Sequence, residues 1–391
     1  MRALVLIDGE HYAPVVRDAL AALPYEVVGA LLVGGTEKIR GGEDYGVPLI
    51  DSLDAVASDL VVDLSDEPVL GPRERMLWAS RALALGLPYI GADFRFDPPP
   101  LEPVATPSLA VIGLGKRIGK TAVAGHAARL LAGDRKVVVV AMGRGGPAEP
   151  ELVETPPTLD DLLALSRSGR HAASDHLEAA VLAGVPAIGC RRAGGGLAGA
   201  PFESNVLEGA QLAAQLEPEL LVFDGSGAAL PPVDADARIL VTNGAHDAGA
   251  GLNAYRVLVS DLVVDTGGAD REAIRSISDV PVVSAELRLR PAEPLAGRRT
   301  AVFTTGPAPT DDLDAEVVHV SRNLARRDAL REELERVEAD VYLIELKGAA
   351  VDVVAEAALA RGAEVVLAAN DVVSPELDER LAALVPDRSR A

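Results

Sequence analysis

A glycine-rich segment with three basic residues lies between an apolar run and an alanine-rich run. It reads Gly113-Leu-Gly-Lys-Arg-Ile-Gly-Lys-Thr121, and Leu109–Ile112 before it predicts a buried strand, whereas the residues after it favour a helix. A strand, a glycine loop ending in G-K-T and a helix form the context that binds a nucleoside triphosphate. In that context backbone amides contact phosphate, the lysine adds positive charge, and the threonine hydroxyl binds Mg²⁺.

The segment departs from the usual G-x-x-x-x-G-K-[ST] pattern at one position. Leu114 stands where the first glycine belongs, and glycines lie on either side of it. We still predict a P-loop, with ATP and Mg²⁺ as cofactors, because G-K-T has the required strand and helix around it. The expected nucleotide-binding residues are Gly113, Gly115, Lys116, Arg117, Ile118, Gly119, Lys120, Thr121, Ala122 and Asn243, the last in a loop after Ile239–Thr242 that could contact the base.

A P-loop enzyme also needs a carboxylate at the end of a neighbouring strand to orient the magnesium shell. Leu220–Phe223 predicts such a strand, and Asp224-Gly-Ser-Gly227 follows it directly. We therefore expect Thr121 and Asp224 to hold the metal ion. Lys120, Lys116 and Asp224 are the predicted catalytic residues, because they would balance charge on the transferring phosphoryl group.

Basic residues and glycines also follow other predicted strands, at the edge where open α/β folds bind ligands. Arg144 follows Lys136–Met142, and Arg191 and Arg192 follow Pro186–Gly189 and precede a second glycine loop. Paired guanidinium groups beside free amides suit a phosphate. The predicted substrate-binding residues are Arg144, His176, Arg191, Arg192, Gly195, Gly196, Arg322, Asn323, Lys347, Glu10 and His11, although Glu10 could equally cap a helix.

Apolar runs that alternate with helix-length segments predict an α/β fold throughout. Five of the eleven residues of Asp97–Pro107 are proline, which indicates a linker. We expect an N-terminal Rossmann-like α/β domain (1–100), a P-loop domain with a parallel sheet flanked by helices (108–285) and a C-terminal α/β domain (286–391).

The composition narrows the class of partner. Lys and Arg total 37 against 59 Asp and Glu, for a net charge of -22, so nucleic acid and anionic membranes are unsuitable partners. The single cysteine, Cys190, favours a reducing compartment, and the apolar run Ala3–Ile7 is too short for a signal peptide. We expect a cytoplasmic protein that acts on a small phosphorylated metabolite, with a homodimer as the default assembly.

Five segments together resemble the cyclic 2,3-diphosphoglycerate synthetase family, and the resemblance covers nearly the whole chain. They are Asp8–Tyr12, Gly115–Thr121, Ser174–Glu178, Cys190–Gly199 and Asp224–Ala228. The resemblance implies ATP-dependent closure of 2,3-diphosphoglycerate into a cyclic anhydride with release of ADP and phosphate. It also implies that some members act as kinases on 2-phosphoglycerate, and that Arg144, Arg191, Arg192 and His176 would hold the substrate.

Two alternatives stay open from the residues alone. The chain could be another P-loop kinase or ligase for a small phosphorylated acid, or a nucleotide-switch accessory GTPase or ATPase. Six scattered histidines and one cysteine argue against a metal-delivering switch protein. A dinucleotide-binding oxidoreductase would need a G-x-G-x-x-G fingerprint instead of G-K-T. The residues alone do not distinguish ATP from GTP as the nucleotide.

Overall fold

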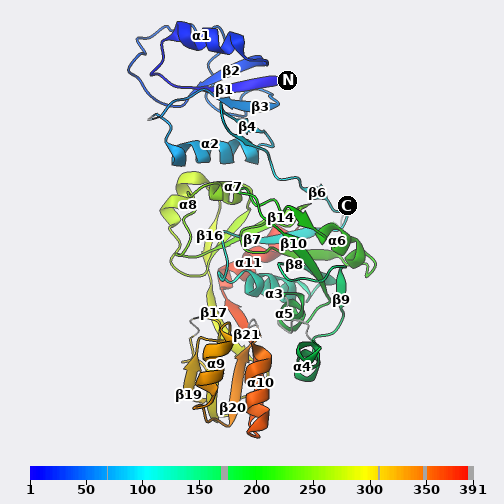
Figure 1. Ribbon diagram of the computed structural model, residues 1–391. Coiled ribbons are helices and arrows are strands. Elements are labelled where there is room, and N and C mark those ends of the chain that lie inside the picture. The colour runs from blue at the N-terminus through cyan, green and yellow to red at the C-terminus, as the bar shows by residue number, and fades with distance from the viewer. Residues whose placement is uncertain (68, 169–174, 307–308, 347–349, 386–391) are drawn as a thin grey trace.

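The computed structural model describes residues 1–67, 69–168, 175–306, 309–346 and 350–385, which form three α/β units in a column (Figure 1). The N-terminal unit holds a sheet of order β2-β1-β3-β4-β5, in which the first four strands are parallel and β5 is antiparallel. Its elements are β1 (Arg2–Ile7), α1 (Ala13–Ala22), β2 (Glu26–Leu32), β3 (Leu60–Asp63), α2 (Pro72–Ala84), β4 (Tyr89–Ile90) and β5 (Arg95–Phe96).

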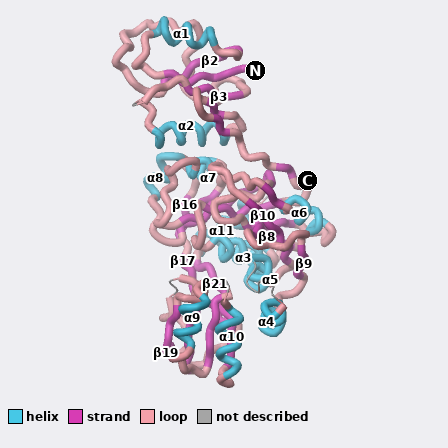
Figure 2. Tube along the Cα trace, in the orientation of Figure 1, coloured by secondary structure: helices cyan, strands magenta, loops and turns pink. Residues whose placement is uncertain are grey.

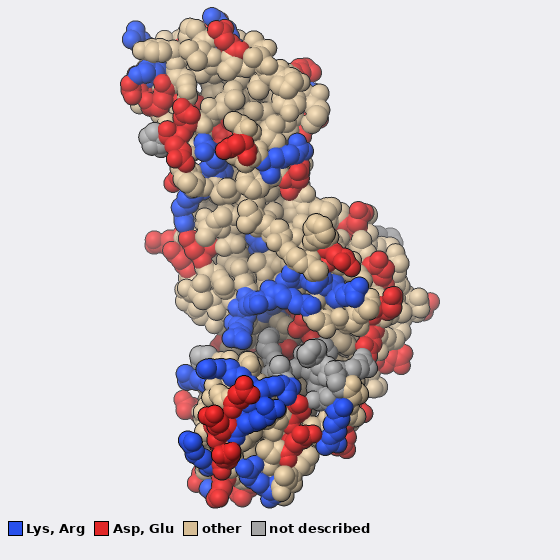
Figure 3. All heavy atoms as spheres, in the orientation of Figure 1, with Lys and Arg blue, Asp and Glu red and all other residues tan. Residues whose placement is uncertain are grey.

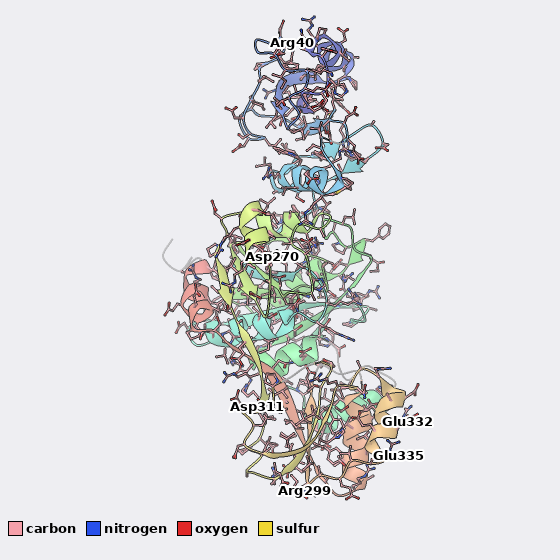
Figure 4. All side chains as sticks on the ribbon, turned by 90° about the vertical axis from the view of Figure 1, so that its left-hand side faces the viewer. Arg40, Asp270, Arg299, Asp311, Glu332 and Glu335 are labelled. Carbon is pink, nitrogen blue, oxygen red and sulfur yellow. The ribbon has the colours of Figure 1, made fainter. Side chains whose placement is uncertain are left out.

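The central unit is built on a sheet whose main strands are parallel, in the order β11-β10-β8-β12-β7-β14-β15-β16. Its strands are β7 (Ser108–Gly113), β8 (Val137–Gly143), β9 (Glu151–Val153), β10 (Ala187–Ala193), β11 (Glu203–Ser204), β12 (Leu220–Asp224), β14 (Ala237–Thr242), β15 (Leu262–Asp265) and β16 (Val282–Ser284). Its helices are α3 (Lys120–Leu131), α4 (Leu159–Arg167), α5 (Asp175–Ala183), α6 (Val206–Ala214), α7 (Asn253–Leu258) and α8 (Arg271–Ile277). Asp270 caps the start of α8 and is labelled in Figure 4.

Helices cover both faces of the central sheet, which explains why its strands are apolar along their whole length. In β8, Val138 and Val140 face the layer of α6 and α7, whereas Val137 and Val139 face the layer of α3 and α5. Alternate residues of a strand point to opposite faces, so a strand covered on both sides needs an unbroken apolar run. The expectation of a parallel sheet flanked by helices is therefore confirmed.

The C-terminal unit has a sheet of order β17-β21-β20-β18-β19. Its elements are β17 (Glu286–Pro291), β18 (Arg299–Phe303), β19 (Glu316–Ser321), α9 (Arg327–Leu334), β20 (Val341–Glu345), α10 (Val351–Ala360) and β21 (Glu364–Val373). Arg299, which begins β18, lies at the end of the column farthest from the central unit (Figure 4). The carboxyl ends of the parallel strands β18, β19 and β20 therefore face the central unit.

Two antiparallel strands, β17 and β21, connect the C-terminal unit to the central unit (Figure 2). After β21 the chain returns to the central unit as α11 (Pro375–Leu384), where Leu377 and Leu381 are fully buried in the same core as α3. Residues 375–384, which the sequence analysis grouped with the C-terminal unit, thus complete the central core.

The proline-rich linker between the first two units is extended and contains β6 (Glu102–Pro103), which pairs with β13 (Val233–Asp234). Within the described residues, no helix combines the length and the apolar character that crossing a bilayer requires.

Candidate active site

The phosphate loop lies between the end of β7 at Gly113 and the start of α3 at Lys120. Its last residue, Gly119, has a φ of 85°, a left-handed conformation that glycine adopts without strain. The Lys120 ammonium group donates to the Gly115 carbonyl at 2.5 Å, and both Lys120 and Thr121 are 7% exposed. The first turn of α3 therefore brings its unpaired backbone amides, the Lys120 ammonium group and the Thr121 hydroxyl together beside the phosphate loop.

A cavity of about 300 Å³ opens beside this loop. Four segments meet around it, the phosphate loop, the loop after β8, the start of α5 and the loop after β12, and Cys190 of β10 adds to its wall. All except α5 follow the carboxyl ends of parallel strands, where open α/β sheets bind ligands. Of the predicted site residues, Lys116, Arg117, Ile118, Gly119, Lys120, Thr121, Arg144 and His176 line the cavity.

Two guanidinium groups approach each other at the edge of this cavity. A Cβ at Gly227 would overlap Nη2 of Arg144 and would lie 3.4 Å from Nη2 of Arg192, so both groups meet over this glycine. Arg192 is 9% exposed and donates to the carbonyls of Gly194 at 2.5 Å and Ser226 at 2.8 Å. Burial and then the charge of Arg144 lower the pKa of Arg192, whereas Asp175 opposes this shift. Two like charges held this closely favour an anion between them.

Asp175 and His176 begin α5 and bring a carboxylate and an imidazole to the cavity. His176 is 5% exposed and packs on Gly189, and Asp175 lies against Gly143. Cys190 also lines the cavity, but burial raises the pKa of its thiol to about 12. The thiol is therefore protonated at neutral pH and is not an activated nucleophile.

Asp224 ends β12 next to the phosphate-loop strand β7 and is 2% exposed. Its carboxylate and the Thr121 hydroxyl are hard oxygen donors, as Mg²⁺ prefers, and Mg²⁺ usually takes one or two such groups plus substrate phosphates. In the part of the chain that the structure describes, no three His, Cys, Asp or Glu residues form a metal-binding group. These donors fit a magnesium ion that arrives with a nucleotide.

Arg191, Gly195, Gly196 and Asn243 are predicted site residues that do not line the cavity. Arg191 points outward and lies 3.6 Å from Glu203, because successive residues of β10 face opposite sides. Gly195 and Gly196 lie in the exposed loop beside the Arg192 guanidinium group. Asn243 follows β14, and its side-chain oxygen accepts from the Ala245 amide at 3.1 Å. Their roles remain predictions.

The other predicted substrate residues belong to the outer units. His11 lies 2.8 Å from Asp8 beside Glu10, in the loop after β1 of the N-terminal unit. Arg322 and Asn323 follow β19 in the C-terminal unit, where the Asn323 amide donates to Glu333 at 3.1 Å. None of these four residues lines the cavity, and Lys347 lies outside the described residues.

The sequence analysis did not select several residues that the fold brings to this region. Asp175, Ser226, Gly145 and Gly146 line the cavity, and the His246 ring lies against Gly115 of the phosphate loop. Asp175 could have been found as the neighbour of His176. Nothing in the local sequence indicates that His246, 131 positions after Gly115, would touch the phosphate loop.

The fold and the cavity define a P-loop nucleotide-binding protein, and comparison with protein families identifies which one. Residues 108–282 match the family model described as cyclic 2,3-diphosphoglycerate synthetase, P-loop domain. Residues 2–97 match the N-terminal domain of the same family, and residues 291–371 match its C-terminal domain. The chain belongs to the cyclic 2,3-diphosphoglycerate synthetase family.

Several similar proteins have that name, and the similarity covers nearly the whole length of each. A cyclic 2,3-diphosphoglycerate synthetase of Rubrobacter xylanophilus is 47% identical, over 97% of this chain and 96% of that protein. Those of Thermococcus kodakarensis and Pyrococcus horikoshii are 42% and 39% identical, over 95% and 93% of this chain and 94% and 91% of those proteins.

Among solved structures, LpxK from Aquifex aeolicus in complex with ATP covers 73% of this chain and 90% of its own, at 15% identity and a TM-score of 0.46. That likeness is too weak to support an argument about this chain.

Proposed function

We propose that this protein is an ATP- and magnesium-dependent synthetase that converts 2,3-diphosphoglycerate to cyclic 2,3-diphosphoglycerate with release of ADP and phosphate. The observation that carries the proposal is the shared cavity, where the phosphate loop and the exposed Arg144 line the same space and the buried Arg192 meets Arg144 at its edge. A transferring phosphoryl group and a second phosphate can therefore be held side by side. Positioning and charge neutralisation supply most of the catalysis in such reactions.

The reaction takes two displacements. In the first, an oxygen of one substrate phosphate attacks the γ-phosphorus of ATP, and the bond to ADP breaks. In the second, an oxygen of the neighbouring phosphate attacks the substrate phosphorus that now carries the extra phosphoryl group, and inorganic phosphate leaves. Both steps gather negative charge, so fixed cations next to the phosphates lower the barrier.

The predicted residues in and beside the cavity have separate parts in this scheme. Lys120 and the amides at the start of α3 bind the β- and γ-phosphates, and Lys116 neutralises charge on the transferring group. Arg144 and Arg192 hold the substrate phosphates, and His176 donates to one of them. Thr121 and Asp224 would hold Mg²⁺, which would neutralise negative charge that develops on the transferring phosphoryl group.

Phosphorus NMR of the protein with ATP, Mg²⁺ and 2,3-diphosphoglycerate tests the reaction. New anhydride resonances should appear together with ADP and phosphate, and Lys120→Ala should lower the rate by about 10²–10³. Phosphorylation of 2-phosphoglycerate without any cyclic product would indicate a kinase instead. ATP that stays intact, or that is hydrolysed without a metabolite product, would refute the synthetase.

Two neighbouring arginines offer a matched test of the substrate site. Arg192→Ala should raise the KM for 2,3-diphosphoglycerate roughly tenfold to a hundredfold, because a charge-assisted contact to phosphate is lost. Arg191→Ala removes the same side chain from the next position of β10, where it faces outward, and should change this KM little. Equal effects of the two variants would argue against the proposed role of Arg192.

A further inference from the structure

The N-terminal unit touches the loop that supports the phosphate loop. Helix α2 of the N-terminal unit lies directly over α7 of the central unit (Figure 1), and the two helices pack together. In the first turn of α2, the Arg73 guanidinium group donates to both carboxylate oxygens of Asp247, at 2.6 Å and 3.1 Å. The pair crosses between units, and 174 residues of sequence separate its members.

Asp247 is well fixed within its own loop. Its carboxylate accepts from the Gly249 amide at 2.8 Å, and its carbonyl accepts from the Asn253 side chain at 2.8 Å at the start of α7. The hydrogen bonds from Arg73 are the largest cause of a lowered pKa for Asp247. The Arg73 guanidinium group also lies against Gly249, where a Cβ would overlap it. The Arg73 guanidinium group therefore contacts both the carboxylate of Asp247 and the backbone at Gly249.

The residue before Asp247 is His246, and its ring lies against the phosphate loop. A Cβ at Gly115 would overlap Cε1 and Nε2 of the imidazole, so the ring sits directly on the Gly115 Cα. Neither Gly115 nor His246 lines the cavity, so the ring supports the loop from outside the phosphate site. The Gly115 carbonyl also accepts from Lys120, so a shift of Gly115 would move the acceptor of the main phosphate-binding lysine.

We propose that His246 is a positioning residue for the triphosphate, and that the N-terminal unit sets its place through the Arg73–Asp247 pair. The inference rests on the proposed nucleotide site and does not depend on which metabolite is the substrate. His246 touches no phosphate; it keeps Gly115 and the loop amides where phosphate oxygens can reach them. The N-terminal unit, which carries no residue of the cavity, thereby tunes nucleotide affinity.

The test is equilibrium titration of the full-length chain with ATP and Mg²⁺, beside a thermal melt of each variant. His246→Ala should raise the Kd for ATP by roughly two- to thirtyfold, and His246→Phe, which keeps a ring over Gly115, should recover most of the loss. Arg73→Asp should raise this Kd about two- to fivefold, and the swap Arg73→Asp with Asp247→Arg should restore it. The Kd for 2,3-diphosphoglycerate should change less in every case.

Arg95→Asp is the matched control, because Arg95 forms an equally exposed pair with Asp97 inside the N-terminal unit. It should leave the Kd for ATP unchanged. If Arg73→Asp folds and binds ATP as Arg95→Asp does, the link from the N-terminal unit is wrong. If His246→Ala keeps the wild-type Kd, the positioning role is wrong whatever Arg73 does. A wild-type protein that does not bind ATP would refute the nucleotide site itself, and this inference with it.

Discussion

The two outer units join the central unit in different ways. The N-terminal unit is connected by one linker and meets the central unit through α2 on α7 and the Arg73–Asp247 pair. The C-terminal unit is connected by two strands, β17 and β21, and the chain then enters the central core as α11. The first junction is a docked surface, and the second is a continuation of the central fold.

The two junctions also contact the phosphate loop in different ways. The N-terminal junction touches the phosphate loop from outside, through His246. At the C-terminal junction, Leu287 of β17 lies next to Gly119 of the phosphate loop. The carboxyl ends of β18, β19 and β20 face the central unit (Figure 4). A band of Lys and Arg side chains crosses the central unit above the C-terminal unit (Figure 3), although the whole chain carries a net charge of -22. Such a local field attracts phosphorylated substrates.

The largest effect is expected where the C-terminal junction enters the core. Leu381→Ala should lower the free energy of unfolding by about 2–5 kcal/mol, because Leu381 is fully buried and its removal leaves a cavity. Leu77→Ala, on the partly buried face of α2, should cost clearly less. Urea unfolding followed by circular dichroism measures both. A larger loss for Leu77→Ala would reverse the distinction between a docked and a continuous junction.

A buried arginine under the N-terminal junction gives the next largest effect. Arg256 of α7 is 2% exposed, donates to the Ala228 carbonyl at 2.8 Å and 2.6 Å and to the Leu197 carbonyl at 3.1 Å. Burial lowers its pKa to about 10, so the side chain stays charged at neutral pH. Arg256→Leu should lower the free energy of unfolding by about 1–3 kcal/mol, because buried carbonyls lose their donors.

The exposed Arg275 of α8 provides the control for that experiment. Arg275→Leu should change stability little, since surface substitutions usually stay within about 0.5 kcal/mol. Similar losses for the two variants would mean that the carbonyl contacts of Arg256 contribute nothing measurable. Because Ala228 follows the cavity loop of β12, Arg256→Leu should also raise the KM for substrate.

The fold and the phosphate loop could be predicted from the sequence because both depend on local patterns. Unbroken apolar runs predict strands covered on two faces, and G-K-T between a strand and a helix predicts the loop. Contacts between distant segments leave no such pattern. The direction of Arg191 against Arg192 depends on the pleat of β10, and the contact of His246 with Gly115 depends on which strand lies beside β7.

The ends of helices are also hard to predict from local sequence patterns. The apolar and charged pattern extends over Leu324–Val337, but α9 begins only at Arg327. Asn323 is the reason, because its side chain binds Glu333 and its carbonyl accepts from the Arg326 amide at 2.6 Å, which forms a turn ahead of the helix.

One carboxylate of the C-terminal unit, Glu333, should contribute to the acid sensitivity of the fold. Burial alone would raise the pKa of Glu333. Hydrogen bonds from Ser321, Asn323 and His319 outweigh this effect, so the pKa lies below the usual 4.5. A lowered pKa in the folded state stabilises above about pH 4.5, and this stability is lost as the pH falls through the folded pKa. Glu333→Gln should therefore flatten the fall in stability below pH 4.5.

Glu335, exposed just after α9 and labelled in Figure 4, is the control for this pH effect. Thermal melts between pH 3 and pH 6 on wild type, Glu333→Gln and Glu335→Gln compare the two carboxylates. The same steepness of the acid transition in wild type and Glu333→Gln would show that the three hydrogen bonds do not stabilise the folded state.

The smallest effects come from one half-buried and one exposed ion pair at the two junctions, and they test whether the junctions act independently. Arg129 of α3 donates to Asp371 of β21 at 2.5 Å, and Arg73 holds Asp247 on the other side of the central unit. Each substitution of the arginine by alanine should lower stability by about 0.2–1 kcal/mol, because both ion pairs remain in contact with water. Since the pairs share no partner, the double variant should equal the sum within about 0.5 kcal/mol. A larger deviation would mean that the two outer units are coupled through the phosphate loop, which lies between His246 and the start of α3. The docked and the continuous junction would then not influence nucleotide binding independently.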